Sequence, residues 1–164
     1  MGCGKSTLGK KLSQVLALPF IDLDEYIETQ KGKSIAAIFQ DEGEIAFRKL
    51  EYQAVLDLIH SPEPAIVSLG GGTPCYFDTM QQISDSLHTA VYLKTSIPSL
   101  VDRLFEERAK RPMISHLSDR EALVEFIGKH LFERAPFYQQ AKVHLTTDNK
   151  TVEELVLELK NGLA

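Results

Sequence analysis

Short apolar runs alternate along this chain with longer segments of helical periodicity. Four runs predict strands, of which three are apolar blocks typical of buried strands and the last is weaker, as at a sheet edge. These runs are Pro19–Asp22, Ala65–Leu69, Thr89–Leu93 and Val143–Thr146. The alternation favours an α/β fold in which helices cover a parallel sheet.

The helical segments carry clearer signals than the strands. An apolar stripe predicts a helix over Thr7–Leu18, and Gly43–His60 carries two apolar rows in which Glu51 is the charged exception. The capping boxes Ser118–Glu121 and Thr151–Glu154 predict the starts of two more helices.

Composition and charge narrow the classes of function. A length of 164 residues suits one domain, and a hydrophobic fraction of 43% is enough for a packed core. The net charge of −5 argues against nucleic acid as a partner. No apolar run approaches the roughly 18–20 residues that span a bilayer, and Cys3 and Cys75 are too few for a disulfide framework. We expect a single-domain cytoplasmic monomer that binds neither membranes nor nucleic acid.

The opening segment Met1–Thr7 matches the second half of a phosphate-binding loop, G-x-x-x-x-G-K-[ST]. Its glycines let successive N–H groups face a polyphosphate, and the helix that follows adds a positive end. In this reading Lys5 reaches the β- and γ-phosphates, Ser6 holds Mg²⁺ and Thr7 reaches an α-phosphate. The candidates for nucleotide binding are Gly2, Cys3, Gly4, Lys5, Ser6 and Thr7. A glycine-containing tail before an amphipathic helix is the alternative for this motif alone.

The first glycine of the phosphate-binding motif belongs five positions before Gly4, and a strand normally precedes it. Both would fall before Met1. We therefore expect a sequence truncated inside the loop, with the first strand of the sheet missing. Loss of a central strand would leave backbone groups unpaired and would weaken ATP binding.

Two carboxylates, Asp22 and Asp24, follow the first predicted strand, at the sheet edge where open α/β folds bind ligands. A carboxylate there could bind Mg²⁺ through water, and another could accept a proton from a substrate hydroxyl. The alternative for Asp24 is that it caps a helix beginning at Glu25.

An arginine and a glycine triplet are the next candidates for ligand binding. Arg48 and Glu51 stand at i and i+3 on one predicted helix, where they can pair, and Glu51 should be partly buried. An arginine held in this way suits a carboxylate ligand, whereas an ordinary surface ion pair is the alternative. The run Gly70-Gly71-Gly72 favours a ligand that touches the backbone, with a flexible turn as the alternative.

Two further arginines follow the glycine triplet. The charged stretch Glu106–Leu117 lacks periodicity and predicts a mobile loop, in which Arg111, beside Pro112, could close over a nucleotide. A solvated charged loop is the alternative. Arg134 precedes Pro136, which we expect to end the helix because the residue before proline disfavours helical geometry. Arg134 could bind a carbonyl at the end of the helix or a second anion.

Taken in this order, the motifs resemble those of the shikimate kinase family over essentially the whole chain. The matching segments are Gly2–Thr7, Phe20–Asp24, Phe47–Glu51, Gly70–Gly72, Arg111-Pro112 and Arg134–Tyr138. The resemblance implies a nucleoside-monophosphate-kinase-like three-layer sandwich with a parallel sheet flanked by helices. It also implies transfer of the γ-phosphate of ATP, with Mg²⁺, to the 3-hydroxyl of shikimate, a step of aromatic amino-acid biosynthesis.

The same resemblance implies a role for each candidate residue. It makes Lys5, Asp24 and Arg111 catalytic, with Asp24 as the base and Arg111 as a lid residue that meets the phosphates. It gives Mg²⁺ to Ser6 and, through water, to Asp22. The remaining substrate contacts are Arg48 and Arg134, which clamp the carboxylate, Glu51, which orients Arg48, and the backbone of Gly70, Gly71 and Gly72.

The resemblance also divides the single domain, 1–164, into working segments. It places a substrate-binding segment at about 27–60, a lid at about 106–117 and an adenine-contacting loop at Thr147–Thr151. Two alternatives remain: a related small-molecule kinase, such as one acting on gluconate, and a nucleotide- or shikimate-binding remnant without turnover.

Overall fold

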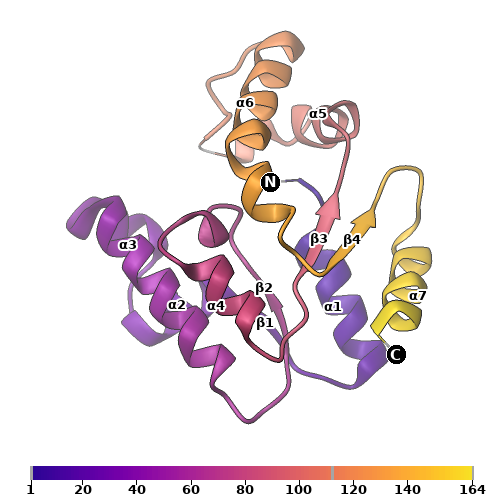
Figure 1. The fold of residues 1–164 in the computed structure, drawn as a ribbon. Helices are drawn as coiled ribbons and strands as arrows, with labels where there is room; N and C mark the ends of the chain where they lie inside the picture. Colours follow the sequence, from indigo (N-terminus) through magenta and orange to yellow (C-terminus); the bar gives the residue numbers. More distant parts are fainter. Residues whose placement is uncertain (1, 112, 164) are drawn as a thin grey trace. The chain divides into compact units, whose positions relative to one another are not determined.

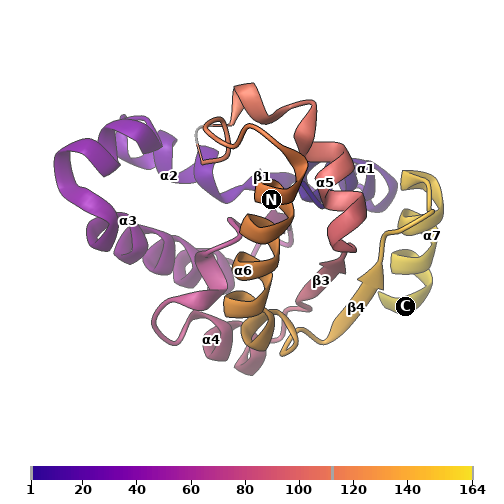
Figure 2. The same ribbon diagram turned by 90° about the horizontal axis from the view of Figure 1, so that it is seen from above.

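A computed structural model describes residues 2–111 and 113–163 of the chain, which form two compact units (Figures 1 and 2). The first unit is Ser6–Ala90, and the second combines Val91–Ala164 with Met1–Lys5. Met1, and Pro112 of the predicted Arg111-Pro112 motif, lie outside the described residues.

Two short parallel strands and the helices around them make up the first unit. Strand β1 pairs with β2 in the register Phe20 with Ile66 and Asp22 with Ser68, and α2 packs along α3 (Figure 1). The elements are α1 (Lys5–Leu16), β1 (Phe20–Asp22), α2 (Leu23–Lys31), α3 (Ile35–Ile59), β2 (Ile66–Ser68), η1 (Thr73–Cys75) and α4 (Thr79–Asp85). The core includes Leu23, Ile27, Ile38, Phe47 and Val55, which are all buried.

Helix α3 begins eight residues earlier than the sequence pattern predicts, at Ile35 instead of Gly43. Its start is capped by Ser34, whose hydroxyl accepts from the N–H of Ala37. The periodicity breaks at Gly43 because this glycine has φ 81° and ψ 174°, which kinks the helix (Figure 2). Glycine tolerates this left-handed φ without a Cβ clash.

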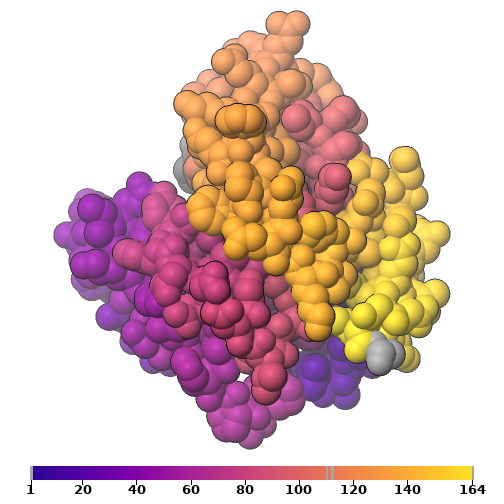
Figure 3. Space-filling view, in the orientation of Figure 1, coloured from indigo at the N-terminus to yellow at the C-terminus, as the bar shows by residue number. Residues whose placement is uncertain are grey.

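The second unit also contains one pair of parallel strands with helices around it. Strands β3 and β4 pair from Val91 with Val143 to Lys94 with Thr146. The elements are β3 (Val91–Lys94), α5 (Ile97–Phe105), η2 (Arg108–Lys110), α6 (Arg120–Tyr138), β4 (Val143–Thr146) and α7 (Val152–Leu163). Helix α5 packs against α6, and atoms of the segment from α6 to β4 are visible in orange to gold in Figure 3.

The four predicted strands are confirmed to within one or two residues at each end. Among the described residues they form two parallel pairs, one in each unit. The segment predicted as a loop, 106–117, contains only turns and the short η2 among its described residues. It is anchored by Ile114, which is fully buried. No helix in the described part of the chain is long and apolar enough to cross a membrane.

Both predicted boundaries of α6 need correction. The cap of α6 is Asp119, not Ser118, because the Asp119 carboxylate accepts from the N–H of Ala122. Helix α6 does not end before Pro136 but continues to Tyr138. Proline removes one hydrogen bond there, in a last turn that packs through Tyr138 on Tyr92, with ring centroids 5.2 Å apart.

Candidate active site

Arg48 is held on helix α3 by two carboxylates from its own helix. Its Nη1 donates to Glu51 Oε2 at 2.6 Å, while Nε and Nη2 donate to Glu44 Oε1 at 3.3 and 3.1 Å. The ring of Tyr76 lies on the guanidinium, 4.3 Å from Cζ to the centroid. Burial alone would lower the pKa of Arg48, but the hydrogen bond and charge of Glu51 and the hydrogen bond of Glu44 raise it.

The Glu51 carboxylate is held in place by burial and by a second hydrogen bond. It is only 2% exposed, and its second oxygen, Oε1, accepts from the hydroxyl of Thr73 at 2.5 Å. Thr73 is 1% exposed. The prediction that Glu51 is buried and paired with Arg48 is therefore confirmed, and Thr73 is a partner that the sequence motifs did not reveal.

The glycine triplet lies directly against this pair of side chains. A Cβ on Gly72 would stand 2.8 Å from Arg48 Nη1, and one on Gly70 would stand 2.9 Å from Thr73 Oγ1 and 3.0 Å from Glu51 Oε1. Positive φ angles occur elsewhere among the described glycines, at Gly2, Gly4, Gly32 and Gly43. Space, not backbone conformation, is therefore what requires glycine at positions 70 and 72.

The two carboxylates after β1 have separate tasks. Asp22 is the cap of α2, since its Oδ1 accepts from the N–H of Asp24 at 3.1 Å. The alternative in which Asp24 caps a helix starting at Glu25 is therefore wrong: Asp24 stands inside the first turn of α2. A Cβ on Gly70 would lie 3.8 Å from Asp24 Oδ1, so this carboxylate borders the glycine triplet.

Asp22 also meets the start of α1. The hydroxyl of Ser6 donates to Asp22 Oδ2 at 3.3 Å, across 16 residues of sequence. A hydroxyl and a carboxylate are oxygen ligands, which suit a hard cation such as Mg²⁺ that keeps water and phosphate in its remaining positions. No cluster of three or more acidic, histidine or cysteine side chains offers an all-protein metal cage in the described residues.

The glycine loop ahead of α1 has the backbone form that a phosphate site needs. Gly2 and Gly4 have φ angles of 73° and 88°, and α1 begins immediately afterwards at Lys5. The Lys5 ammonium lies 3.8 Å from Cys3 Sγ, and Thr7 is exposed in the first turn of the helix. These residues place N–H groups and a cation at a helix N-terminus, as anion binding requires.

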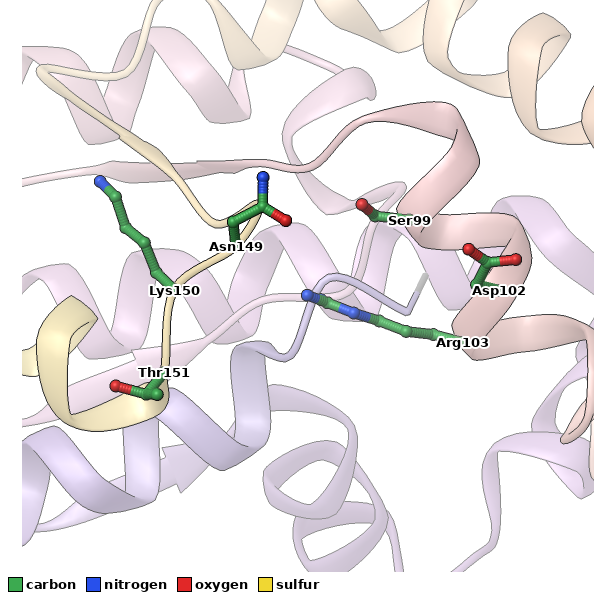
Figure 4. Close-up of a pocket in the computed structure, with 6 residues that line it drawn as sticks. All are labelled: Ser99, Asp102, Arg103, Asn149, Lys150 and Thr151. Atoms are coloured by element: carbon green, nitrogen blue, oxygen red, sulfur yellow. The ribbon is translucent and has the colours of Figure 1, made fainter.

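The second unit contains a pocket of about 450 Å³ between α5 and the loop before α7. Figure 4 shows the six residues that line it, with the Arg103 side chain extending away from α5. They are Ser99, Asp102, Arg103, Asn149, Lys150 and Thr151. The last three belong to the predicted adenine loop Thr147–Thr151, whereas no motif pointed to Ser99, Asp102 or Arg103.

Asp148 fixes the loop side of this pocket. Its carboxylate accepts from the hydroxyls of Ser99 and Ser96 and from the N–H of Ser96, at the cap of α5. These hydrogen bonds lower the pKa of Asp148, that from Ser99 most. Arg103, one turn further along α5, reaches the carbonyl of Gly2 at 3.5 Å.

The two remaining predicted arginines also belong to the second unit. Arg111 pairs with Glu107 at 2.8 Å within the predicted lid. Arg134 is partly buried on α6, one turn after His130. Burial, and after it the charge of Arg134, lowers the pKa of that histidine.

Parallel strands flanked by helices, a glycine loop leading into α1 and a held arginine beside a glycine triplet define the class of P-loop small-molecule kinases. A family model described as shikimate kinase matches residues 1–164. The chain belongs to the shikimate kinase family, and the resemblance seen in its motifs is confirmed.

Individual relatives agree with this assignment. The shikimate kinase of Flavobacterium johnsoniae is 45% identical over 164 residues, which cover 100% of this chain and 95% of the relative. The crystal structure of the shikimate kinase from Bacteroides thetaiotaomicron matches with a TM-score of 0.89 at 35% identity, covering 99% of this chain and 93% of that one. The Acinetobacter baumannii shikimate kinase in complex with shikimate matches with a TM-score of 0.83 at 26% identity, covering 99% and 88%.

A gluconokinase from Sinorhizobium meliloti is a more distant match. Its structure gives a TM-score of 0.51 at 16% identity, covering 99% of this chain and 86% of that one. At that identity the match reports a shared fold and nothing about the substrate.

Proposed function

We propose that this chain phosphorylates the 3-hydroxyl of shikimate with ATP, giving shikimate 3-phosphate and ADP. The observation that carries the proposal is the Arg48 guanidinium, held by the buried Glu51 and bordered by the glycine triplet. Such a fixed fork recognises a carboxylate by paired hydrogen bonds. Membership of the shikimate kinase family supports the choice of acid.

In this proposal the substrate lies over the first unit, with its carboxylate on Arg48 and its hydroxyls toward Asp24 and the triplet. Asp24 accepts the proton of the reacting hydroxyl, as a positioned carboxylate can. Gly71 contributes its backbone to the hydroxyls, and Gly70 and Gly72 leave room for the side chains beneath. The family resemblance supports Arg134 as a second arginine for the substrate carboxylate.

The nucleotide lies along the glycine loop. The N–H groups of Gly2, Cys3 and Gly4 face the phosphates, Lys5 neutralises the β- and γ-phosphates, and Thr7 meets the α-phosphate. Ser6, whose hydroxyl donates to Asp22, would hold Mg²⁺ directly and Asp22 would hold it through water, and the ion would neutralise charge on the phosphates. Arg111 approaches the transferred phosphate from the lid.

We propose that the adenine base occupies the pocket at Arg103 and the loop Asn149–Thr151. The pocket is open to solvent and measures about 450 Å³, and Arg103 offers a planar cation on which a base can stack. We also propose that the enzyme works as a cytoplasmic monomer, to which its net charge of −5 and composition are suited.

A coupled assay with MgATP tests the activity directly. We expect ADP release with shikimate and none above background with gluconate. Release with gluconate alone would make the protein a related small-molecule kinase. Calorimetric binding of shikimate without any ADP release would make it the non-catalytic remnant instead.

A further inference from the structure

The guanidinium of Arg48 offers a ligand an edge that one of the protein's own carboxylates already occupies. Glu51 takes Nη1 at 2.6 Å, on one side of the group. On the other side, Nε and Nη2 both donate to a single oxygen of Glu44, at 3.3 and 3.1 Å. Two parallel N–H groups on one edge are the geometry that a bidentate carboxylate ligand uses.

The two glutamates that contact Arg48 differ in how firmly they are held. The Glu51 side chain is 3% exposed and is tied to Thr73, whereas the Glu44 side chain is 54% exposed. Glu44 also follows Gly43, where α3 is kinked. The Arg48 side chain is 12% exposed, so only the Glu44 side of this ion pair is open to solvent. Water can solvate Glu44 when it leaves Arg48 but cannot reach Glu51, so displacing Glu44 costs less than displacing Glu51.

A second contact holds Glu44 at the site. The hydroxyl of Tyr76 donates to the same Glu44 Oε1 at 3.1 Å, and the Tyr76 ring covers the guanidinium. The Glu44 carboxylate is thus placed where an acidic ligand would meet Arg48. Two carboxylates cannot share this edge, because their charges repel and the edge offers only two N–H groups.

We propose that Glu44 is a specificity-determining residue that occupies the Nε–Nη2 edge of Arg48 until the substrate carboxylate displaces it. This inference rests on the proposed function, in which Arg48 binds the acid group of shikimate. Glu44 then opposes the binding of acids only. A neutral analogue leaves Glu44 on Arg48 and meets no competition. Glu44 therefore reduces the difference in affinity between the acid and its neutral analogues.

The variant Glu44→Gln tests this competition, because it removes the charge and keeps the length of the side chain. We expect the KM for shikimate to fall about two- to fivefold, the range that weak exposed ion pairs allow. The kcat and the KM for ATP should stay unchanged. Calorimetry should show the same fold-change in Kd for shikimate and none for the analogue in which a hydroxymethyl group replaces the carboxylate.

A matched control separates competition from general electrostatics. Glu42→Gln removes the same charge two residues away, from a side chain that pairs with Lys33 at 3.6 Å and not with Arg48. We expect this variant to leave the KM for shikimate unchanged. An equal fall in both variants would overturn the inference, because it would reflect only reduced repulsion of an anion.

The variant Arg48→Lys separates failure of this inference from failure of the proposed function. If Arg48→Lys raises the KM for shikimate but Glu44→Gln leaves it unchanged or raises it, Glu44 supports the clamp and the competition is overturned. If Arg48→Lys leaves that KM unchanged, Arg48 does not bind the acid, and the proposed clamp and the inference both fall.

Discussion

Removing the Thr73 hydroxyl tests whether the buried carboxylate of Glu51 needs two donors. Thr73→Val keeps the β-branched shape and deletes only the group that donates to Glu51 Oε1. Both residues are almost completely buried, at 1% and 2% exposed. Water therefore cannot reach Glu51 Oε1 to replace the lost hydrogen bond.

The expected loss follows from the charge on the acceptor. A hydrogen bond to a charged group contributes about 1.5–3 kcal/mol, against about 1 kcal/mol for one between neutral groups. For a protein of this size, about 1 kcal/mol shifts the melting temperature by about 2–4 °C, so Tm should fall by about 3–12 °C. The KM for shikimate should rise as well, because Glu51 orients Arg48.

Thr79→Val is the matched control for this substitution. Thr79 is also 1% exposed, but its hydroxyl donates to a neutral acceptor, the carbonyl of Tyr76, at 2.7 Å. We expect it to lose about 1 kcal/mol in the free energy of unfolding, measured by denaturant titration, with no change in KM. Equal losses in the two variants, with KM unchanged in both, would refute the role given to Thr73.

Three other substitutions test the remaining assignments. Asp24→Asn should lower kcat by a factor on the order of 10²–10⁴, as loss of a positioned base does, and near-normal turnover would remove Asp24 from that role. Arg48→Lys should raise the KM for shikimate strongly in steady-state kinetics, because a point charge replaces a two-pronged donor. The pKa of Asp148 is lowered by the hydrogen bonds of Ser99 and Ser96, so its carboxylate stabilises the fold above the ordinary aspartate pKa and loses that effect as pH falls through the lowered value. Acid titrations of Tm should therefore show a weaker decline for Asp148→Asn than for the parent, and parallel curves would contradict this linkage.

Local signals in the sequence predicted the strands and the start of α7 well. The capping box at Thr151–Glu154 is confirmed in both directions, with Thr151 N–H donating to Glu154 Oε2 and Glu154 N–H donating to Thr151 Oγ1. Helix α5 was missed although Ser96, with Pro98 two residues later, is a recognisable start. Before Gly43 the apolar pattern follows a different helical axis, so a single periodicity could not find the first turns of α3.

In the candidate site, too, local patterns predicted some residues, but they did not predict the contacts between residues far apart in the sequence. A charged residue inside an apolar row predicted a buried Glu51, because such a position requires a partner. Thr73 contacts it across 22 residues, and Asp148 contacts Ser96 across 52. No spacing rule encodes such contacts, since they depend on how loops return to helices. The glycine triplet was recognised as a place of close approach, but the sequence could not say that protein side chains approach Gly70 and Gly72.

One helix supplies both carboxylates that contact Arg48, at positions four before and three after it. Helical geometry places all three on one face, so spacing alone treats Glu44 and Glu51 as equivalent partners. Burial makes them different. Separating Glu51 from Arg48 would leave a buried charge without its partner, because Glu51 is enclosed. The exposed Glu44 carboxylate can instead be solvated by water when it leaves Arg48. Glu51 would therefore keep Arg48 in position while the substrate carboxylate replaces Glu44 on the other side of the guanidinium.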